Sequence, residues 1–278
     1  MQADLGEAAL EAVPAMPLPL VLGAWGASLA VAAVLVSRRR RRLPSVTAAP
    51  QERVPWGGRD VAAVVLIYVG VQIAFLSLVP RDAGMDLQLL AGIATNLVVT
   101  LVGAAVLRGC GASWRSLGFL PAGHDAAVAL AALTLVLAPL LTLAAVLDWF
   151  VPYRHPLVEF LAGRGDAAAI GLAILAAVGA APLAEEFFFR RVLQGWLEKR
   201  LPEAGGVAAV VGSSAAFALA HHGQGLAWVP LFLFGLVLGW MARRTGSIVP
   251  CILLHAAFNA VSVTLLITTA GSAAPAGG

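Results

Sequence analysis

The sequence predicts an all-α, polytopic membrane protein, a bundle of about eight transmembrane helices with the N-terminus and the C-terminus outside. Hydrophobic residues make up 60% of the chain and charged residues only 12%, whereas soluble domains carry about 25% charged residues. The apolar runs have the length of membrane-spanning helices, about 20 residues. They do not alternate as ten-residue strands, which excludes an outer-membrane barrel.

The basic residues predict the orientation of these spans. With the N-terminus outside, 15 of the 18 Lys and Arg residues fall in cytoplasmic segments, the side on which basic residues are enriched in membrane proteins. These 15 are the arginines at 38–42, Arg53, Arg59, Arg108, Arg115, Arg190, Arg191, Lys199, Arg200, Arg243 and Arg244.

The N-terminal part begins with residues 1–16, which carry acidic side chains and no Lys or Arg, unlike the basic start of a signal peptide. Residues 17–36 form the first predicted span, and the five arginines at 38–42 follow it as a stop-transfer signal. Their position beside a membrane helix favours this topological role over nucleic-acid binding, so no nucleic-acid partner is expected. Residues 43–58 contain three prolines and a paired glycine, which is typical of a linker.

Seven further apolar segments follow the linker, with a polar interval between the third and the fourth of them. A G-x-x-x-G step, Gly235 and Gly239, predicts a surface for close helix contact in the seventh of the eight spans. A tail of small residues ends the chain and is predicted to be disordered. The seven predicted spans are 60–78, 87–107, 126–147, 167–190, 207–221, 226–241 and 248–269.

Two carboxylates and an arginine end the fifth span. Charged side chains at membrane depth are costly and need a partner, a wet cavity or a function. Glu186 and Arg190 lie four residues apart with the acid first, the favourable order for an ion pair on a helix. Glu185 lies about 100° around the helix from Glu186, so it is the carboxylate left free for chemistry. The alternative is a charge cluster that only anchors the end of the helix.

Three other polar residues stand out in the apolar segments of the C-terminal half. His221 closes the sixth span, and His255 and Asn259 lie four residues apart in the eighth, on one helical face. A single buried histidine is more often a packing residue than a ligand, and Asn259 alone could join two helices. Together with the carboxylate pair, these residues on three separate helices predict one functional site.

Two kinds of chemistry suit this set. A water between Glu185 and His221 could lose a proton to the carboxylate and attack a carbonyl, while His255 and Asn259 donate hydrogen bonds to the oxyanion. Alternatively, Glu185, His221 and His255 could hold a catalytic zinc with one open position, although no H-E-x-x-H motif is present. Cys110 and Cys251 have neither metal-type nor redox-type spacing. Peptide hydrolysis by activated water is the reaction class that we favour.

Three short motifs carry a family resemblance. Glu185-Glu186-Phe-Phe-Phe-Arg190, Phe217-Ala-Leu-Ala-His221 and His255-Ala-Ala-Phe-Asn259 resemble, in this order, the signature motifs of the CPBP family. These are the CAAX-protease and bacteriocin-processing intramembrane proteases, also called the Abi family, which include the type II CAAX prenyl endopeptidases. The resemblance covers residues 166–267.

The resemblance implies a role for each motif residue. Glu185 would be the catalytic carboxylate, and His221 would help to hold the water. His255 and Asn259 would stabilise the oxyanion, and Glu186 with Arg190 would support the site. Both a metal-dependent and a metal-free glutamate mechanism are proposed for the family, so a zinc cofactor and a metal-free reaction are both open.

The resemblance also implies an intramembrane endopeptidase whose partners are the lipid bilayer and a membrane-associated protein or peptide substrate. The alanine- and arginine-rich composition suggests a high-GC bacterium, hence a multi-pass protein of the bacterial inner membrane and substrates other than prenylated CAAX proteins. A transporter or a non-catalytic scaffold using the same polar cluster is the alternative. The expected division is an anchor with its linker at 1–58, accessory helices at 59–165, the catalytic core at 166–270 and a disordered tail at 271–278.

Overall fold

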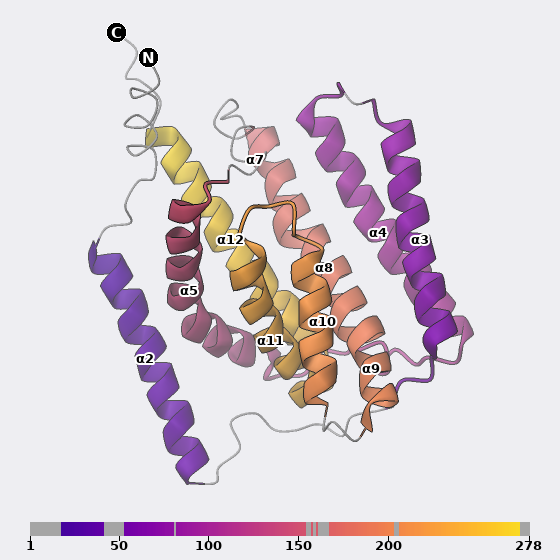
Figure 1. The fold of residues 1–278 in the computed structure, drawn as a ribbon, viewed down its shortest axis with the longest axis horizontal. Coiled ribbons are helices and arrows are strands. Elements are labelled where there is room, and N and C mark those ends of the chain that lie inside the picture. Colours follow the sequence, from indigo (N-terminus) through magenta and orange to yellow (C-terminus); the bar gives the residue numbers. More distant parts are fainter. Residues whose placement is uncertain are drawn as a thin grey trace.

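The computed structural model describes residues 18–41, 53–80, 82–153, 157, 160, 167–202 and 206–272. Every element among them is a helix, and the long helices lie side by side as a bundle (Figure 1). The predicted all-α membrane fold is therefore confirmed. The predictions for residues 1–16, for most of the linker and for the tail at 273–278 lie outside the described part, as do Arg154, His155 and Arg164 of the polar interval.

All eight predicted segments are helical. The fifth is one continuous helical path in which two π-helical stretches, η1 and η2, interrupt the α-helix. The elements are α2 (Leu18–Arg40), α3 (Gly58–Leu78), α4 (Met85–Gly109), α5 (Asp125–Phe150), α7 (Ala167–Ile174), η1 (Leu175–Ala180), α8 (Ala181–Glu185), η2 (Glu186–Leu193), α9 (Gln194–Arg200), α10 (Val207–Leu219), α11 (Trp228–Thr245) and α12 (Val249–Ser272).

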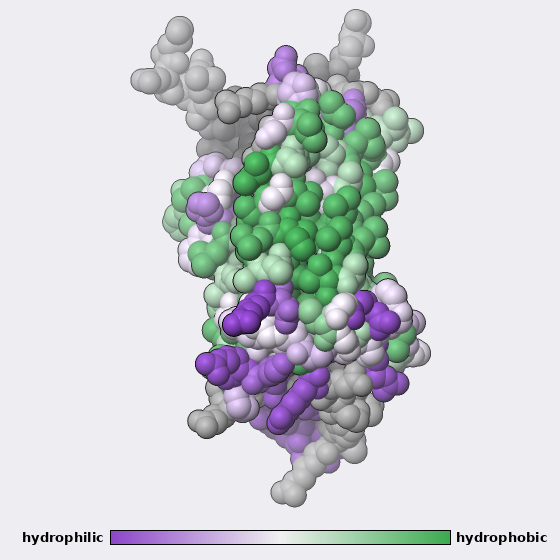
Figure 2. All heavy atoms as spheres, turned by 90° about the vertical axis from the view of Figure 1, so that its right-hand side faces the viewer, coloured by the Kyte–Doolittle hydropathy of each residue, from purple (hydrophilic) through white to green (hydrophobic). Residues whose placement is uncertain are grey.

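Five of these helical segments are long and apolar enough to cross a membrane, namely α2, most of α3, α4, α5 and the path from α7 to α9. α10 and the first part of α12 are shorter apolar helices, so the total of eight spans stays a prediction. Figure 2 shows the matching surface: a broad hydrophobic band above a hydrophilic end. The last turns of α2, α4, α9 and α11 all carry basic residues, and these turns lie at the lower end in Figure 1. That end is the predicted cytoplasmic side.

Close packing of α10 on α11 depends on the two glycines of the predicted G-x-x-x-G step. A Cβ atom at Gly235 would lie 3.0 Å from Cβ of Ser214, and one at Gly239 would lie 3.1 Å from Cγ1 of Val210, and both of these neighbours are on α10. A side chain at either glycine would crowd α10. The predicted contact surface is therefore confirmed, and it holds α11 against the helices that carry the site.

The end of the predicted linker packs against the core. Trp56 is completely buried, and its Nε1 donates a hydrogen bond to the carbonyl of Val192, 3.1 Å away. Lys199 Nζ donates to the carbonyls of Pro55 and Trp56. The guanidinium of Arg191 lies 5.7 Å from the Trp56 ring. These contacts fasten the segment before α3 to η2 and α9 at the charged end of the bundle.

Candidate active site

The two candidate glutamates follow a π-helical stretch. Ala181 N–H, at the end of η1, donates to the carbonyl of Ala176, five residues back instead of four. Pro182 follows directly and has no N–H to donate, which disturbs the α-helical hydrogen-bond pattern. The sequence predicted an uninterrupted α-helix here. Such π turns occur frequently at functional sites. This one determines the direction in which the side chains of Glu185 and Glu186 point from the helix.

Glu186 is the buried centre of the cluster. Its side chain is inaccessible to solvent, and Oε2 lies 3.2 Å from Nε of Arg190. This confirms the ion pair predicted from the four-residue spacing. The contact lacks hydrogen-bond geometry, so charge attraction is what joins the two groups. Glu186 Oε1 lies 2.8 Å from Nδ1 of His255, which is a full hydrogen bond.

Arg190 is also completely buried. Its guanidinium carbon lies 4.5 Å from the centre of the Phe217 ring and 5.9 Å from that of Phe189, distances at which a cation is attracted to an aromatic face. None of its three guanidinium nitrogens has a hydrogen-bond partner among the described residues. The charge of Arg190 is therefore compensated mainly by Glu186 and by the aromatic faces.

His255 joins the two glutamates. With Nδ1 bonded to Glu186, Nε2 faces Glu185 and lies 3.8 Å from its Oε2. This distance is too long for a direct hydrogen bond. The imidazole is fixed between Phe217 and Phe234, whose rings meet it nearly at right angles. The side chain of Glu185 is 26% exposed and that of Glu186 is fully buried, so Glu185 is the carboxylate that water can reach.

His221 lies in the turn after α10, because that helix ends at Leu219, two residues before the predicted end. Its Nδ1 lies 2.9 Å from the carbonyl of Phe217, and its ring packs on the Phe217 ring. Among the described residues, no hydrogen bond or ion pair joins His221 to Glu185. Phe217 contacts both histidine rings, a role that its position in the motif does not predict.

Asn259 is directed at the backbone of η1. Its Nδ2 donates to the carbonyl of Ala177, 2.7 Å away. The structure thus brings Glu185, Glu186, Arg190 and His255 into one cluster. Asn259 lies one turn further along α12 from His255. The ring of His221 packs on that of Phe217. Spacing could not identify Ala177 or Phe234 as neighbours of the site, since both contacts are between helices far apart in sequence.

Glu185, His221 and His255 do not form a preformed metal centre in the described structure. In the part of the chain that the structure describes, no three His, Cys, Asp or Glu side chains are grouped so that they could hold a metal ion. The Nδ1 contacts of both histidines do leave Nε2 as the ring atom available for a ligand or a water.

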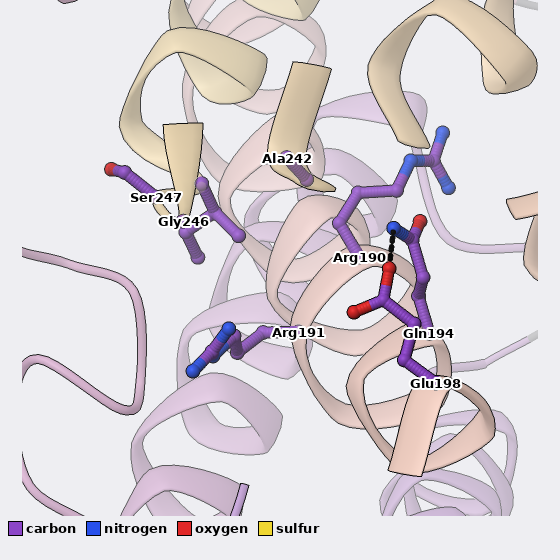
Figure 3. A pocket seen from close by; sticks show the side chains of 8 residues that line it. Arg190, Arg191, Gln194, Glu198, Ala242, Gly246 and Ser247 are labelled. Carbon is purple, nitrogen blue, oxygen red and sulfur yellow. Dashed lines mark hydrogen bonds between the residues drawn. The ribbon is translucent and has the colours of Figure 1, made fainter. Parts of the chain in front are cut away.

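A small polar pocket continues from the cluster towards the charged end. Arg190, Gln194 and Glu198 follow Glu186 at four-residue steps and contribute to its lining (Figure 3). Gln194 Nε2 donates to Glu198 Oε1 and to the carbonyl of Gly239. The cavity offers about 10 Å³, roughly the space of one water. It is far too small for a peptide, and Glu185 is not among its lining residues, so it is not the substrate site.

Comparison with known families confirms the resemblance. Residues 167–261 match the model of the family described as "Type II CAAX prenyl endopeptidase Rce1-like". The matched segment includes all six candidate residues and extends from the start of α7 into α12. No curated protein and no solved structure matches the chain.

Proposed function

Because residues 167–261 form a domain of the Rce1-like type II CAAX prenyl endopeptidase family, we propose that the protein is an intramembrane endopeptidase acting on a membrane-associated protein or peptide. The family match supports CAAX-type endopeptidase activity in general, and with the apolar helices it makes the chain an integral, multi-pass membrane protein. One observation supports the proposal most strongly: an accessible carboxylate, Glu185, faces a histidine that a second, buried carboxylate holds in place.

Glu185 acts as the general base in this proposal. A water hydrogen-bonded to its carboxylate transfers a proton to it, and the water oxygen attacks the carbonyl carbon of the scissile peptide bond. The π electrons of the carbonyl move to its oxygen. When the tetrahedral intermediate collapses, the C–N bond breaks, and the leaving nitrogen takes the proton from Glu185. One water is consumed and the carboxylate is restored.

Glu186 and His255 act as a fixed pair beside this base. Glu186 accepts the Nδ1 hydrogen bond, which orients the imidazole with Nε2 towards Glu185 and the reacting groups. A protonated Nε2 can then donate to the developing oxyanion, and such donors are most effective when they are preorganised in a site that excludes water. Arg190 balances the negative charge of Glu186, because its Nε lies 3.2 Å from the other carboxylate oxygen.

His221 is proposed to hold the attacking water. Its Nδ1 contact with the Phe217 carbonyl leaves Nε2 as the ring atom for that purpose. Metal analysis decides between this role and a zinc ligand. Stoichiometric zinc that is lost in His221→Ala, with cleavage abolished by chelator, would make the enzyme a metalloprotease. Cleavage that survives complete metal removal and requires Glu185 would make it a glutamate protease.

The substrate class follows from the location of the site. Glu185 lies in a helical path that is long and apolar enough to cross a bilayer, so the scissile bond must belong to a chain that reaches the membrane. The bacterial inner membrane is the proposed location, because the alanine- and arginine-rich composition is typical of a high-GC bacterium. Prenylated proteins are not required by this proposal.

Reconstitution of the full chain in liposomes tests the function. The substrate is a library of membrane-anchored, fluorescence-quenched peptides with varied sequence near the anchor, and mass spectrometry identifies the products. We expect cleavage at an internal peptide bond, which releases a peptide longer than one residue. A folded wild-type protein that cleaves no member of the library, or that removes single residues from an end, would contradict the proposal.

A further inference from the structure

One backbone carbonyl of η1 lacks a donor in its own helix. In a π turn the carbonyl of residue i accepts from the N–H of residue i+5, as Ala176 does from Ala181. For Ala177 the residue at i+5 is Pro182, which has no N–H. The residue at i+4 is Ala181, and its N–H donates to Ala176. In a membrane, a polar backbone group left in this state must find a partner on a neighbouring helix.

Asn259 is that partner. α12 packs along η1 and α8, and Nδ2 of Asn259 donates to the Ala177 carbonyl at 2.7 Å, across 82 positions of sequence. We propose that Asn259 is a positioning residue: it satisfies the carbonyl that Pro182 leaves without a donor, and it thereby holds the π turn that directs Glu185 and Glu186 towards His255. The proposal rests on the proposed function in one respect, the role of Glu185 as the base.

The geometry shows why this turn matters for catalysis. An α-helix advances about 100° per residue, so a π turn that reverted to α would rotate everything after it by about that angle relative to α7. Glu185 lies only three residues after Pro182. Such a rotation would remove Glu186 from the Nδ1 atom of His255, now 2.8 Å away, and Glu185 from Nε2. Asn259 and His255 lie four residues apart on α12, so one helix both fixes the turn and receives the glutamates.

This role differs from direct oxyanion stabilisation, which the family resemblance implies for Asn259. The amide carries two N–H groups, and one of them is committed to Ala177. A positioning residue acts through Ala177, so its importance must depend on Pro182. An oxyanion donor acts on the substrate, so its importance must not depend on Pro182. The two roles are thus separable by combining substitutions at both positions.

The experiment is a double-mutant cycle on the full chain with wild type, Asn259→Ala, Pro182→Ala and the double variant. Melting temperature and kcat on a cleaved library peptide are measured for each. With Pro182 present, Asn259→Ala leaves a carbonyl without a donor, and we expect a lower melting temperature and a kcat reduced about tenfold or more. In the Pro182→Ala background the loss should shrink, because the Ala177 carbonyl then accepts from the N–H of residue 182 in a π turn or of residue 181 in an α turn.

The control is Thr264→Val, also on α12, because the Thr264 hydroxyl is exposed and, among the described residues, bonds only to the carbonyl of Ala260 in its own helix. It should change neither quantity.

Two results would overturn the inference. An equal drop in melting temperature caused by Asn259→Ala in the wild-type and in the Pro182→Ala background would show that the Ala177 contact is unimportant. A drop that depends on Pro182, combined with a kcat loss that does not, would assign Asn259 to the reacting groups instead. If wild type cleaves nothing, the proposed function fails, and the melting temperatures still decide whether Asn259 supports the turn.

Discussion

Glu186→Gln should be among the most destabilising single substitutions in the core. The glutamine keeps an oxygen that can accept from His255 Nδ1 but loses the charge opposite Arg190, 3.2 Å away. Both side chains are inaccessible to solvent, so the guanidinium would be left buried and uncompensated. Breaking a buried ion pair from one side costs about 3–5 kcal/mol. At about 2–4 °C per kcal/mol for a chain of this size, the melting temperature should fall by about 6–20 °C.

Thermal unfolding of the detergent-purified protein, followed by circular dichroism, measures this loss. The double variant Glu186→Gln, Arg190→Met removes both charges and should recover most of the stability, because no uncompensated buried charge is then left. Asp82→Asn, at an exposed position between α3 and α4, is the matched control and should melt like wild type. A Glu186→Gln protein that melts within about 2 °C of wild type would refute the structural role of the pair.

Three further predictions concern residues outside the site. Trp56→Ala should destabilise the protein by about 3–5 kcal/mol, because the ring is fully buried and its Nε1 donates a hydrogen bond to the carbonyl of Val192. A melting temperature equal to that of wild type would show that the segment before α3 is not fastened to the core. Cys110 is exposed and Cys251 is buried, so an impermeant maleimide should label only Cys110, and only from the cytoplasmic side. The hydrogen bond from the Cys110 thiol to Asp60 raises the pKa of Cys110, so labelling at neutral pH should be slow and should become faster in Asp60→Asn; an unchanged rate would contradict this.

The helices and the ion pair were predictable because both depend on local pattern. Long apolar stretches must form helices in a bilayer, where no other open structure satisfies the backbone, and all eight predicted segments are helical. Glu186 and Arg190 meet because residues four apart lie on one face of a helix, and the π-helical stretch around them keeps them in contact. Gly235 and Gly239 were also recognisable, since small residues at this spacing permit close packing.

The contacts between distant segments were not predictable. Pro182 is visible in the sequence, but whether its missing N–H produces a π turn depends on a donor from another helix, which Asn259 supplies. The burial of Trp56 against Val192 depends in the same way on tertiary packing. The sixth span was predicted to end at His221, but α10 ends two residues earlier, at Leu219, and His221 lies in the following turn.

The comparison of Glu185→Gln with wild type in the liposome cleavage assay tests the central claim most directly. Glu185 is partly exposed, and its Oε2 lies 3.8 Å from Nε2 of His255, beyond direct hydrogen-bond distance, so the substitution should leave the melting temperature unchanged. Loss of the base should reduce kcat by about 10²–10⁴-fold. A Glu185→Gln variant that folds and cleaves at the wild-type rate would show that another group activates the water.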